Sequence, residues 1–240
     1  PTDVIVVISK PPAKEVRDEV VALLQKCTKP VVAIFLGEKP ENHEGKVYLA
    51  HTLEETARMA VDLANGDPIK DNYCDPINYE VSKPLAADKT VKGLYSGGSL
   101  AAEAGMLIAE ALNLGGLIKE EGYILKTGGY EVGDLGDDVY TQGKPHPMID
   151  PEVRIKKILE CAKDPQTGVI LLDCMLGYGC HPDMAGALAP AIREAQEIAK
   201  ADGRELYFVA SVCGTRQDPQ DYDRAVAELK ECGVLVEESN

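Results

Sequence analysis

The segment 133–154, GDLGDDVYTQGKPHPMIDPEVR, holds a dense set of side chains that can do chemistry. It contains a Gly-Lys pair and a histidine between two prolines. No apolar period runs through the segment until its end, so core packing does not explain its composition. We therefore expect a ligand-facing loop in which Pro145 and Pro147 hold Lys144 and His146 in position, and these two are the candidate catalytic groups. The alternative interpretation of His146 is a rigid loop residue with a satisfied hydrogen bond.

Three aspartates of the same segment form a candidate site for Mg²⁺ and a nucleotide phosphate: Asp134, Asp137 and Asp138. Carboxylates are preferred Mg²⁺ ligands, and Lys144 would add a positive charge for the phosphate. A solvated acidic turn is the alternative. His181, in GCHPD, is a further candidate acid–base group or metal ligand. Because no pair of ligands has the i, i+4 spacing of a helical metal site, the sequence predicts no firm metal centre.

Three segments share a pattern in which glycines and small polar residues join a buried strand to a helix. They are YSGGSLAAEA (95–104), LGYGCHPDMAG (176–186) and CGTRQDPQDY (213–222). Glycine lets the backbone approach a ligand closely, and the free N–H groups that begin a helix attract anions. None matches the P-loop or the GxGxxG pattern, so a tight turn is the alternative for each. The candidate phosphate- or substrate-binding residues are Ser96, Gly97, Gly98, Ser99, Gly177, Tyr178, Gly179, Cys180, Gly214 and Thr215.

The most specific prediction concerns the middle segment, residues 176–186. A helix that begins at Pro182 would aim free amides outward, with roughly half a positive charge at its end. We expect a phosphate, sulfate or carboxylate at the amide of Gly179 or Cys180. The 144–150 loop would fold over it and bring Lys144 and His146 to the anion.

The elements that position these loops fall into two units. In residues 1–66, buried strands are expected at 4–8, 31–35 and 47–49, with a helix from 16 and another that Thr52 and Glu55 begin with a capping box. Residues 67–90 contain prolines and no period, which predicts a linker. In residues 91–240, strands are expected at 91–95, 122–125, 130–132, 169–172, 206–212 and 234–236, and helices at 100–112, from Pro151, at 182–199 with a kink at Pro190, and at 219–232. This alternation predicts an α/β fold with two parallel-sheet, three-layer domains.

The composition limits which partners and which cellular compartment are expected for this protein. The 240 residues carry a formal net charge of −15 with a pI near 4.7, which argues against a nucleic acid or an anionic membrane surface as partner. The seven cysteines are scattered, which indicates reduced thiols in a cytoplasmic protein. No apolar run approaches a membrane span, and no signal peptide opens the chain. His43 and His51 stand in polar sequence and are expected at the surface.

Four motifs together resemble a known family: SGGSLAAEA, GDLGDDVYTQGKPHPMIDPEVR, ILLDCMLGYGCHPDMAGALAPAI and VCGTRQDPQ. They look like the C-terminal two thirds of FdrA-type proteins, relatives of succinyl-CoA synthetase (ADP-forming acyl-CoA ligases). The resemblance implies two flavodoxin-like domains: residues 3–65 are similar to the second domain of the synthetase α subunit, and residues 91–239 to the C-terminal ligase domain of the β subunit. It also implies a CoA-binding Rossmann domain before Pro1, a closing helix after Asn240, partner subunits and a possible homo-oligomer. CoA, a nucleotide or Mg²⁺ would belong to that full protein, with no cofactor in this fragment.

The resemblance implies a phosphate or acyl ligand between two helix N-termini, after Lys10-Pro11-Pro12 and after the 177–180 loop. The synthetase carries its phosphohistidine in a GHAGA motif, but this chain runs from KPVVAIFLG directly into EKPENHEG. We therefore expect no acyl-CoA ligase turnover from this chain alone. One alternative function is a carbamoyltransferase subunit that acts on oxalurate or oxamate and carbamoyl phosphate in allantoin degradation. A non-catalytic regulatory or scaffolding subunit is the other.

Overall fold

The computed structural model describes residues 2–40, 43–73, 84–117 and 120–240. The chain divides into two compact units, Pro1–Glu80 and Val81–Asn240. The division falls inside the segment predicted as a linker, of which residues 74–83 lie outside the described part.

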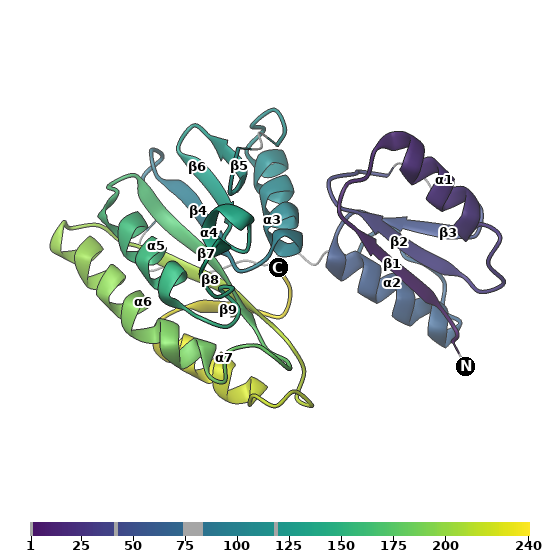
Figure 1. Cartoon of the computed structure of the whole chain (residues 1–240). Helices are drawn as coiled ribbons and strands as arrows, with labels where there is room; N and C mark the ends of the chain where they lie inside the picture. The colour runs from purple at the N-terminus through teal and green to yellow at the C-terminus, as the bar shows by residue number, and fades with distance from the viewer. Residues whose placement is uncertain (1, 41–42, 74–83, 118–119) are drawn as a thin grey trace. The chain divides into compact units, whose positions relative to one another are not determined.

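The first unit is a three-stranded parallel sheet between two helices (Figure 1). Its strands, in the spatial order β1-β2-β3, are β1 (Ile5–Ser9), β2 (Val31–Phe35) and β3 (Val47–Ala50). Helix α1 (Lys14–Leu24) packs Val21 against the face of β2 that carries Val31, Ala33 and Phe35. Helix α2 (Leu53–Asn65) contacts all three strands. The amide of Glu55 donates to the Thr52 hydroxyl at 3.0 Å, so the predicted capping interaction at the start of α2 is present.

The second unit is a six-stranded sheet in the order β5-β6-β4-β7-β8-β9. Its strands are β4 (Thr90–Tyr95), β5 (Tyr123–Thr127), β6 (Tyr130–Asp134), β7 (Thr167–Met175), β8 (Tyr207–Cys213) and β9 (Leu235–Glu237). Neighbouring strands are parallel except β5 and β6, which form an antiparallel hairpin. Its two-residue turn is Gly128-Gly129, with φ of 57° and 88°, a backbone conformation that favours glycine.

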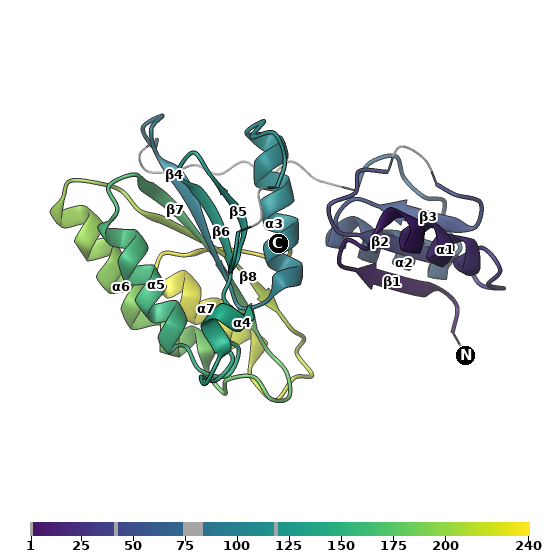
Figure 2. The same cartoon turned by 45° about the horizontal axis from the view of Figure 1, so that its top comes forward.

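Helices cover both faces of this sheet, as Figure 2 shows. Helix α3 (Gly98–Ala111) lies on one face, and α5 (Glu152–Lys163), α6 (Met184–Ala201) and α7 (Tyr222–Glu231) lie on the other. A single turn, α4 (Asp138–Thr141), follows β6. The predicted α/β class with parallel-sheet domains is therefore confirmed.

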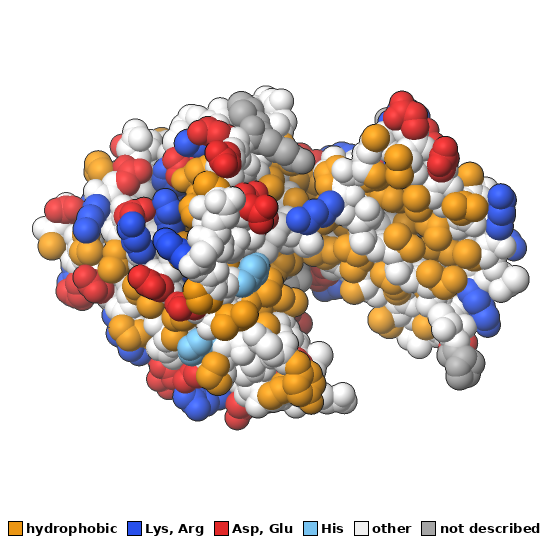
Figure 3. All heavy atoms as spheres, viewed as in Figure 1, with side chains coloured by type: hydrophobic (Ala, Val, Ile, Leu, Met, Phe, Trp, Pro, Cys, Tyr) orange, Lys and Arg blue, Asp and Glu red, His pale blue; other side chains and the backbone are white. Residues whose placement is uncertain are grey.

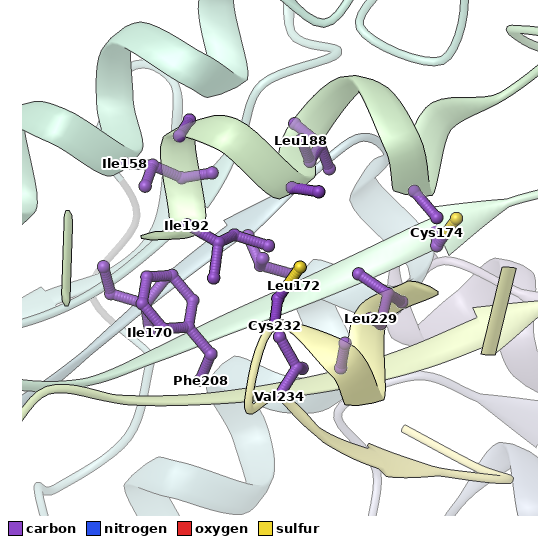
Figure 4. Packing of buried hydrophobic residues seen from close by; sticks show 14 of the residues in the cluster. Ile158, Ile170, Leu172, Cys174, Leu188, Ile192, Phe208, Leu229, Cys232 and Val234 are labelled. Carbon is purple, nitrogen blue, oxygen red and sulfur yellow. The ribbon is translucent and has the colours of Figure 1, made fainter. Parts of the chain in front are cut away.

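The main core fills the space between the sheet and α5, α6 and α7 (Figure 4). Alternate residues of β7, Ile170, Leu172 and Cys174, meet Ile192 of α6 and Phe208 of β8 there. Strand β7 extends to Met175, three residues beyond the predicted end, and the Asp173 carboxylate on it accepts from the Ser96 amide. Among the residues that the structure describes, no helix has both the length and the apolar character needed to cross a bilayer.

Four helices of the second unit begin elsewhere than predicted. Helix α6 begins at Met184 rather than Pro182, and α7 at Tyr222 rather than at residue 219, because Asp183 and Asp221 act as N-caps that stay outside the helix. Helix α3 begins two residues early, at Gly98. Pro151 is the N-cap of α5 instead of its first residue, and Pro190 lies inside α6.

Candidate functional site

The carboxyl ends of β4, β6, β7 and β8 lie at one edge of the sheet, because these strands are parallel. In open α/β sheets, ligands bind at this edge. The loops that meet here come from distant parts of the sequence. We name as the edge site the residues Ser96, Gly97, Gly98, Ser99, Gly136, His146, Met148 and His181.

A buried ion pair holds the loop after β4. The carboxylate of Asp173 accepts hydrogen bonds from the Ser96 amide (2.9 and 3.1 Å) and from the Ser96 hydroxyl (2.6 Å). Arg154 of α5 donates to the same carboxylate at 2.9 Å and to the carbonyl oxygens of Leu94 (3.4 Å) and Asp173 (2.5 Å). Both charged side chains are only 1% exposed, so solvent does not screen this pair. The buried ion pair thus fixes the position of Ser96.

Helix α3 begins directly after this loop without a side-chain cap. Its N-cap, Gly97, has an extended backbone, and Gly97 and Gly98 are half-buried while Ser99 is exposed. By contrast, aspartate side chains cap α6 and α7, where they accept from the amides of Gly186 and Arg224. A helix end with unused amides and no carboxylate favours an anion. The N-terminus of α3 is therefore the best candidate for an anion site at this edge.

The segment 144–150 connects the loops after β4 and β7. The His181 amide donates to the Met148 carbonyl at 2.7 Å, and the Met148 methyl group lies 3.0 Å from where a Cβ on Gly97 would be. A Cβ on Gly136 would lie 2.6 Å from His146 Nε2 and 2.8 Å from the Ser96 carbonyl oxygen. Glycine at 136 is therefore required for the His146 ring to lie against the Ser96 loop. The structure thus brings His146 into the edge site.

The loop 177–183 is held by Gln220. Its side chain accepts from the Gly177 amide (2.9 Å) and donates to the carbonyls of Gly177 (3.0 Å) and His181 (3.3 Å). Gly177 and Gly179 have φ of 133° and 83°, in the region that glycine favours, and Tyr178 between them is 92% exposed. The loop is a pinned turn that presents an aromatic side chain to solvent.

The loop 177–183, where we expected an anion, has a different arrangement of hydrogen bonds. The Cys180 amide donates to the Gly177 carbonyl at 3.2 Å, so it is already used within the loop. The Asp183 carboxylate caps α6 and also accepts from Arg224 at 2.7 Å. A carboxylate at this helix end offsets the charge that would attract an anion. The expectation for the Gly179 amide stays a prediction, and α3 offers the better geometry.

The third segment, residues 213–222 after β8, forms a turn that its own hydrogen bonds stabilise. The Thr215 amide donates to the Asp218 carboxylate at 2.6 Å, and the Thr215 hydroxyl accepts from the Gln217 amide at 3.1 Å. A Cβ on Gly214 would lie 2.6 Å from Leu176 Cβ, so glycine there allows the loops after β7 and β8 to pack together. These contacts account for Gly214 and Thr215 without a ligand.

The aspartates and the lysine of the segment 133–154 do not converge. Asp134 accepts from the Gly136 amide (3.0 Å), and Asp137 caps α4 by accepting from the Val139 amide (3.1 Å), while Asp138 is exposed. In the described part of the chain, no three His, Cys, Asp or Glu side chains gather so that they could hold a metal ion. Lys144 is exposed, and its backbone amide bonds to the Thr141 carbonyl (3.1 Å).

The histidines have defined roles. His146 Nδ1 accepts from the Met148 amide (3.2 Å), and His181 Nδ1 accepts from the Asp183 amide (3.0 Å). Figure 3 shows the histidines of the second unit, in pale blue, at its surface. His43 is exposed as expected, whereas His51 is half-buried, with Nδ1 2.7 Å from the Glu38 carbonyl oxygen.

Burial raises the pKa of the Cys180 thiol, and the nearby Asp218 raises it further. The thiol is therefore protonated at neutral pH, which argues against Cys180 as a nucleophile.

Sequence reasoning missed Asp173 and Arg154. The available signal was a charged residue inside the apolar run VILLDCM, which is unusual in a buried strand. Arg154 also lies four residues before Ile158, on the helix face that is buried.

Comparisons with known proteins identify the family. The model of the CoA-ligase family matches residues 94–240. The chain is also 36% identical, over 256 aligned residues, to the uncharacterized protein YahF of Escherichia coli (strain K12), a match that covers all of this chain and 48% of YahF. The chain thus spans about half the length of this curated relative. Because the family match covers more than half of the chain, the protein belongs to the CoA-ligase family, which is succinyl-CoA synthetase-like.

Proposed function

We propose that this chain is the ligase part of a larger FdrA-type protein and that its second unit binds a phosphate or an acyl carboxylate at the N-terminus of α3. The observation that carries the proposal is the uncapped start of α3 beside Ser96, which the buried pair of Asp173 and Arg154 holds in place. The amides that follow Gly97 would bind the anion, and the Ser99 hydroxyl would add a donor. The remaining CoA-binding and nucleotide-binding functions would belong to other parts of the protein or to partner subunits.

Family resemblance also implies Mg²⁺, but the residues present do not fit it. Asp134 and Asp137 accept from nearby backbone amides, Asp138 is exposed, and no group of three ligands forms among the described residues. We therefore assign the edge site the binding and orientation of an anion, with no step that involves a metal ion.

Carbamoyl transfer is the second candidate, and one observation favours it. In the segment after β2, where the synthetase has GHAGA, this chain has EKPENHEG, which lacks the motif of a phosphohistidine relay. Transfer of a carbamoyl group between phosphate and an oxalurate-type or oxamate-type substrate requires no such relay. The same helix terminus suits the phosphate of carbamoyl phosphate. If the protein binds carbamoyl phosphate and not succinate, carbamoyl transfer is favoured over acyl-CoA ligation.

The substitution Ser99→Asp tests the anion site. It places a carboxylate in the first turn of α3, where it would favour the helix by about 0.3–1 kcal/mol but repel a bound anion. We expect the dissociation constant for inorganic phosphate, measured by calorimetry, to rise about tenfold or more, which corresponds to about 1.4 kcal/mol. Ser99→Ala, the neutral control, should change it by about threefold at most. Equal affinity of Ser99→Asp and the parent would place the anion elsewhere, and a parent that binds no anion would support a scaffolding role.

The substitution Gly136→Ala tests the positioning of His146. The new methyl group would lie 2.6 Å from His146 Nε2 and 2.8 Å from the Ser96 carbonyl, so the 144–150 segment must shift. We expect anion binding to weaken by about tenfold, a loss of about 1.4 kcal/mol, while the sheet stays folded by circular dichroism. Gly133→Ala is the matched control, because its Cβ would meet its nearest atom at 3.6 Å. If both variants bind alike, His146 takes no part in the site.

A further inference from the structure

Strand β1 lies at one edge of the first sheet. In the part of the chain that the structure describes, it pairs with β2 alone. The Ile5 amide donates to the Pro30 carbonyl at 3.0 Å, so the backbone groups of Ile5 point toward β2. Because these groups alternate in direction along a strand, those of Val6 and Ile8 point away from β2. The outer edge of β1 therefore presents backbone donors and acceptors that no described strand uses.

The opposite edge of the same sheet is covered. In β3, the Val47 amide and carbonyl exchange hydrogen bonds with Glu44 at 2.9 and 3.0 Å, and the Leu49 amide donates to His43 Nδ1 at 3.1 Å. The segment before β3 thus pairs with the outward backbone groups of that strand. The two edges of one small sheet therefore differ, and only β1 is left open among the described residues.

Apolar side chains are exposed on both faces of the sheet around β1. Val6 and Ile8 are 45% and 57% exposed, on the face of β1 that is turned away from α1. Helix α1, on the other face, exposes Val16 (51%) and Leu23 (62%). In Figure 3, apolar side chains, in orange, gather on the visible face of the first unit. These side chains would be buried if the sheet continued beyond β1.

The sequence of β1 does not protect this edge. Its five residues, IVVIS, include no charged residue and no proline, and its register with β2 is regular from Ile5 to Ser9. Natural edge strands are usually blunted by lysine, by proline or by a bulge, or they are covered by another segment. A regular apolar strand with an open edge is therefore suited to accept a further strand.

We propose that β1 pairs with a strand from the rest of a longer protein, supplied by the part that corresponds to the unmatched half of YahF. This chain covers 48% of YahF, so about as much polypeptide again can supply the strand. A second copy of the chain is the less favourable occupant, because each copy carries a formal net charge of −15 and the two would repel. The added strand would place apolar side chains beside Val6 and Ile8. The inference rests on the proposal that this chain is part of a larger protein, and it is independent of the anion site.

Hydrogen exchange, followed by NMR, tests this pairing. In the 240-residue chain alone, we expect the Val6 and Ile8 amides to exchange at least about 100-fold faster than the Val7 amide, which points toward β2. The Val47 amide, which bonds to Glu44, is the control for a covered edge. In full-length YahF, the amides aligned with Val6, Val7 and Ile8 should exchange within about tenfold of one another. If the two outward amides also exchange about 100-fold faster than the third in YahF, the inference fails.

Sedimentation velocity tests the second copy as the occupant. We expect the chain alone to be a monomer. Val6→Lys places a charge on the open edge, and Val61→Lys, at a valine of α2 that is 58% exposed, is the matched control. A dimer that Val6→Lys dissociates and Val61→Lys does not would show that a second copy occupies the edge, and would overturn the inference. Phosphate binding by the second unit is measured separately, so a parent that binds no phosphate would refute the anion site while protected outward amides in YahF would still support the pairing of β1.

Discussion

Asp173→Asn is expected to lower the free energy of unfolding of the second unit by about 3–5 kcal/mol, because it leaves the charge of Arg154 buried without a counter-charge. The carboxylate also accepts from the Ser96 amide and hydroxyl, and asparagine keeps only one of its two oxygen acceptors, so the loop before α3 loses part of its anchor. Urea denaturation followed by circular dichroism measures the change.

The control is an ion pair with good geometry but no burial. Arg216 donates to both carboxylate oxygens of Asp223 at 3.0 and 2.9 Å on an exposed surface. Solvent screens such a pair, so Asp223→Asn should change stability little. Comparable losses in the two variants would show that burial is not what makes the Asp173 pair important.

A double substitution separates stability from function. Replacing both partners, with Arg154→Met and Asp173→Leu, removes the uncompensated charge, and apolar replacements of buried ion pairs are often neutral or stabilising. We expect the double variant to recover most of the stability lost by Asp173→Asn. It should still bind phosphate weakly, because Ser96 has lost its acceptor. Recovery of binding together with stability would show that the pair does not position the site.

Strands such as β2 were predictable because each is a short apolar run with a clear boundary. All five residues of β2 are buried, as a continuous apolar sequence indicates for a strand of a parallel sheet. Helix starts were less predictable, because they depend on which side chain caps the first amides. At α6, Pro182 suggested the first helical residue, but the Asp183 carboxylate caps the helix one residue later.

The sequence indicated which loops form the candidate site, but it did not indicate which side chains contact one another there. The motifs that contain Ser96, His146 and the 177–180 loop do lie at one edge of the sheet. However, sequence spacing carries no information about the direction of a side chain, and Lys144 is exposed whereas His181 is tied to Met148. The pairing of Arg154 with Asp173 joins α5 to β7 across 19 residues, so it follows from the tertiary fold. The charge at Asp173 showed only that a partner must exist.

At alkaline pH, the second unit is expected to lose stability because of its buried thiols. Burial raises the pKa of Cys161 and of Cys174 from 9.0 to about 11, and that of Tyr140 from 10.0 to about 12. Each folded-state pKa lies above the unfolded value, so the stabilising effect is complete below about pH 9 and is lost as the pH rises toward 11. At about 1.4 kcal/mol for each pH unit, each thiol accounts for up to about 3 kcal/mol.

Cys174 allows a direct test, since it lies on β7 in the main core (Figure 4). We expect Cys174→Ala to be less stable than the parent at pH 7.5, because it removes a buried sulfur atom. Its free energy of unfolding should then fall less steeply between pH 9 and pH 10.5, because one thiol that favours the protonated folded state is gone. Cys27→Ala, in the first unit, controls for removal of a thiol and should leave the slope of the second unit unchanged. Parallel pH profiles for Cys174→Ala and the parent would mean that the Cys174 thiol ionises as readily in the folded core as in the unfolded chain, against the burial that the structure shows.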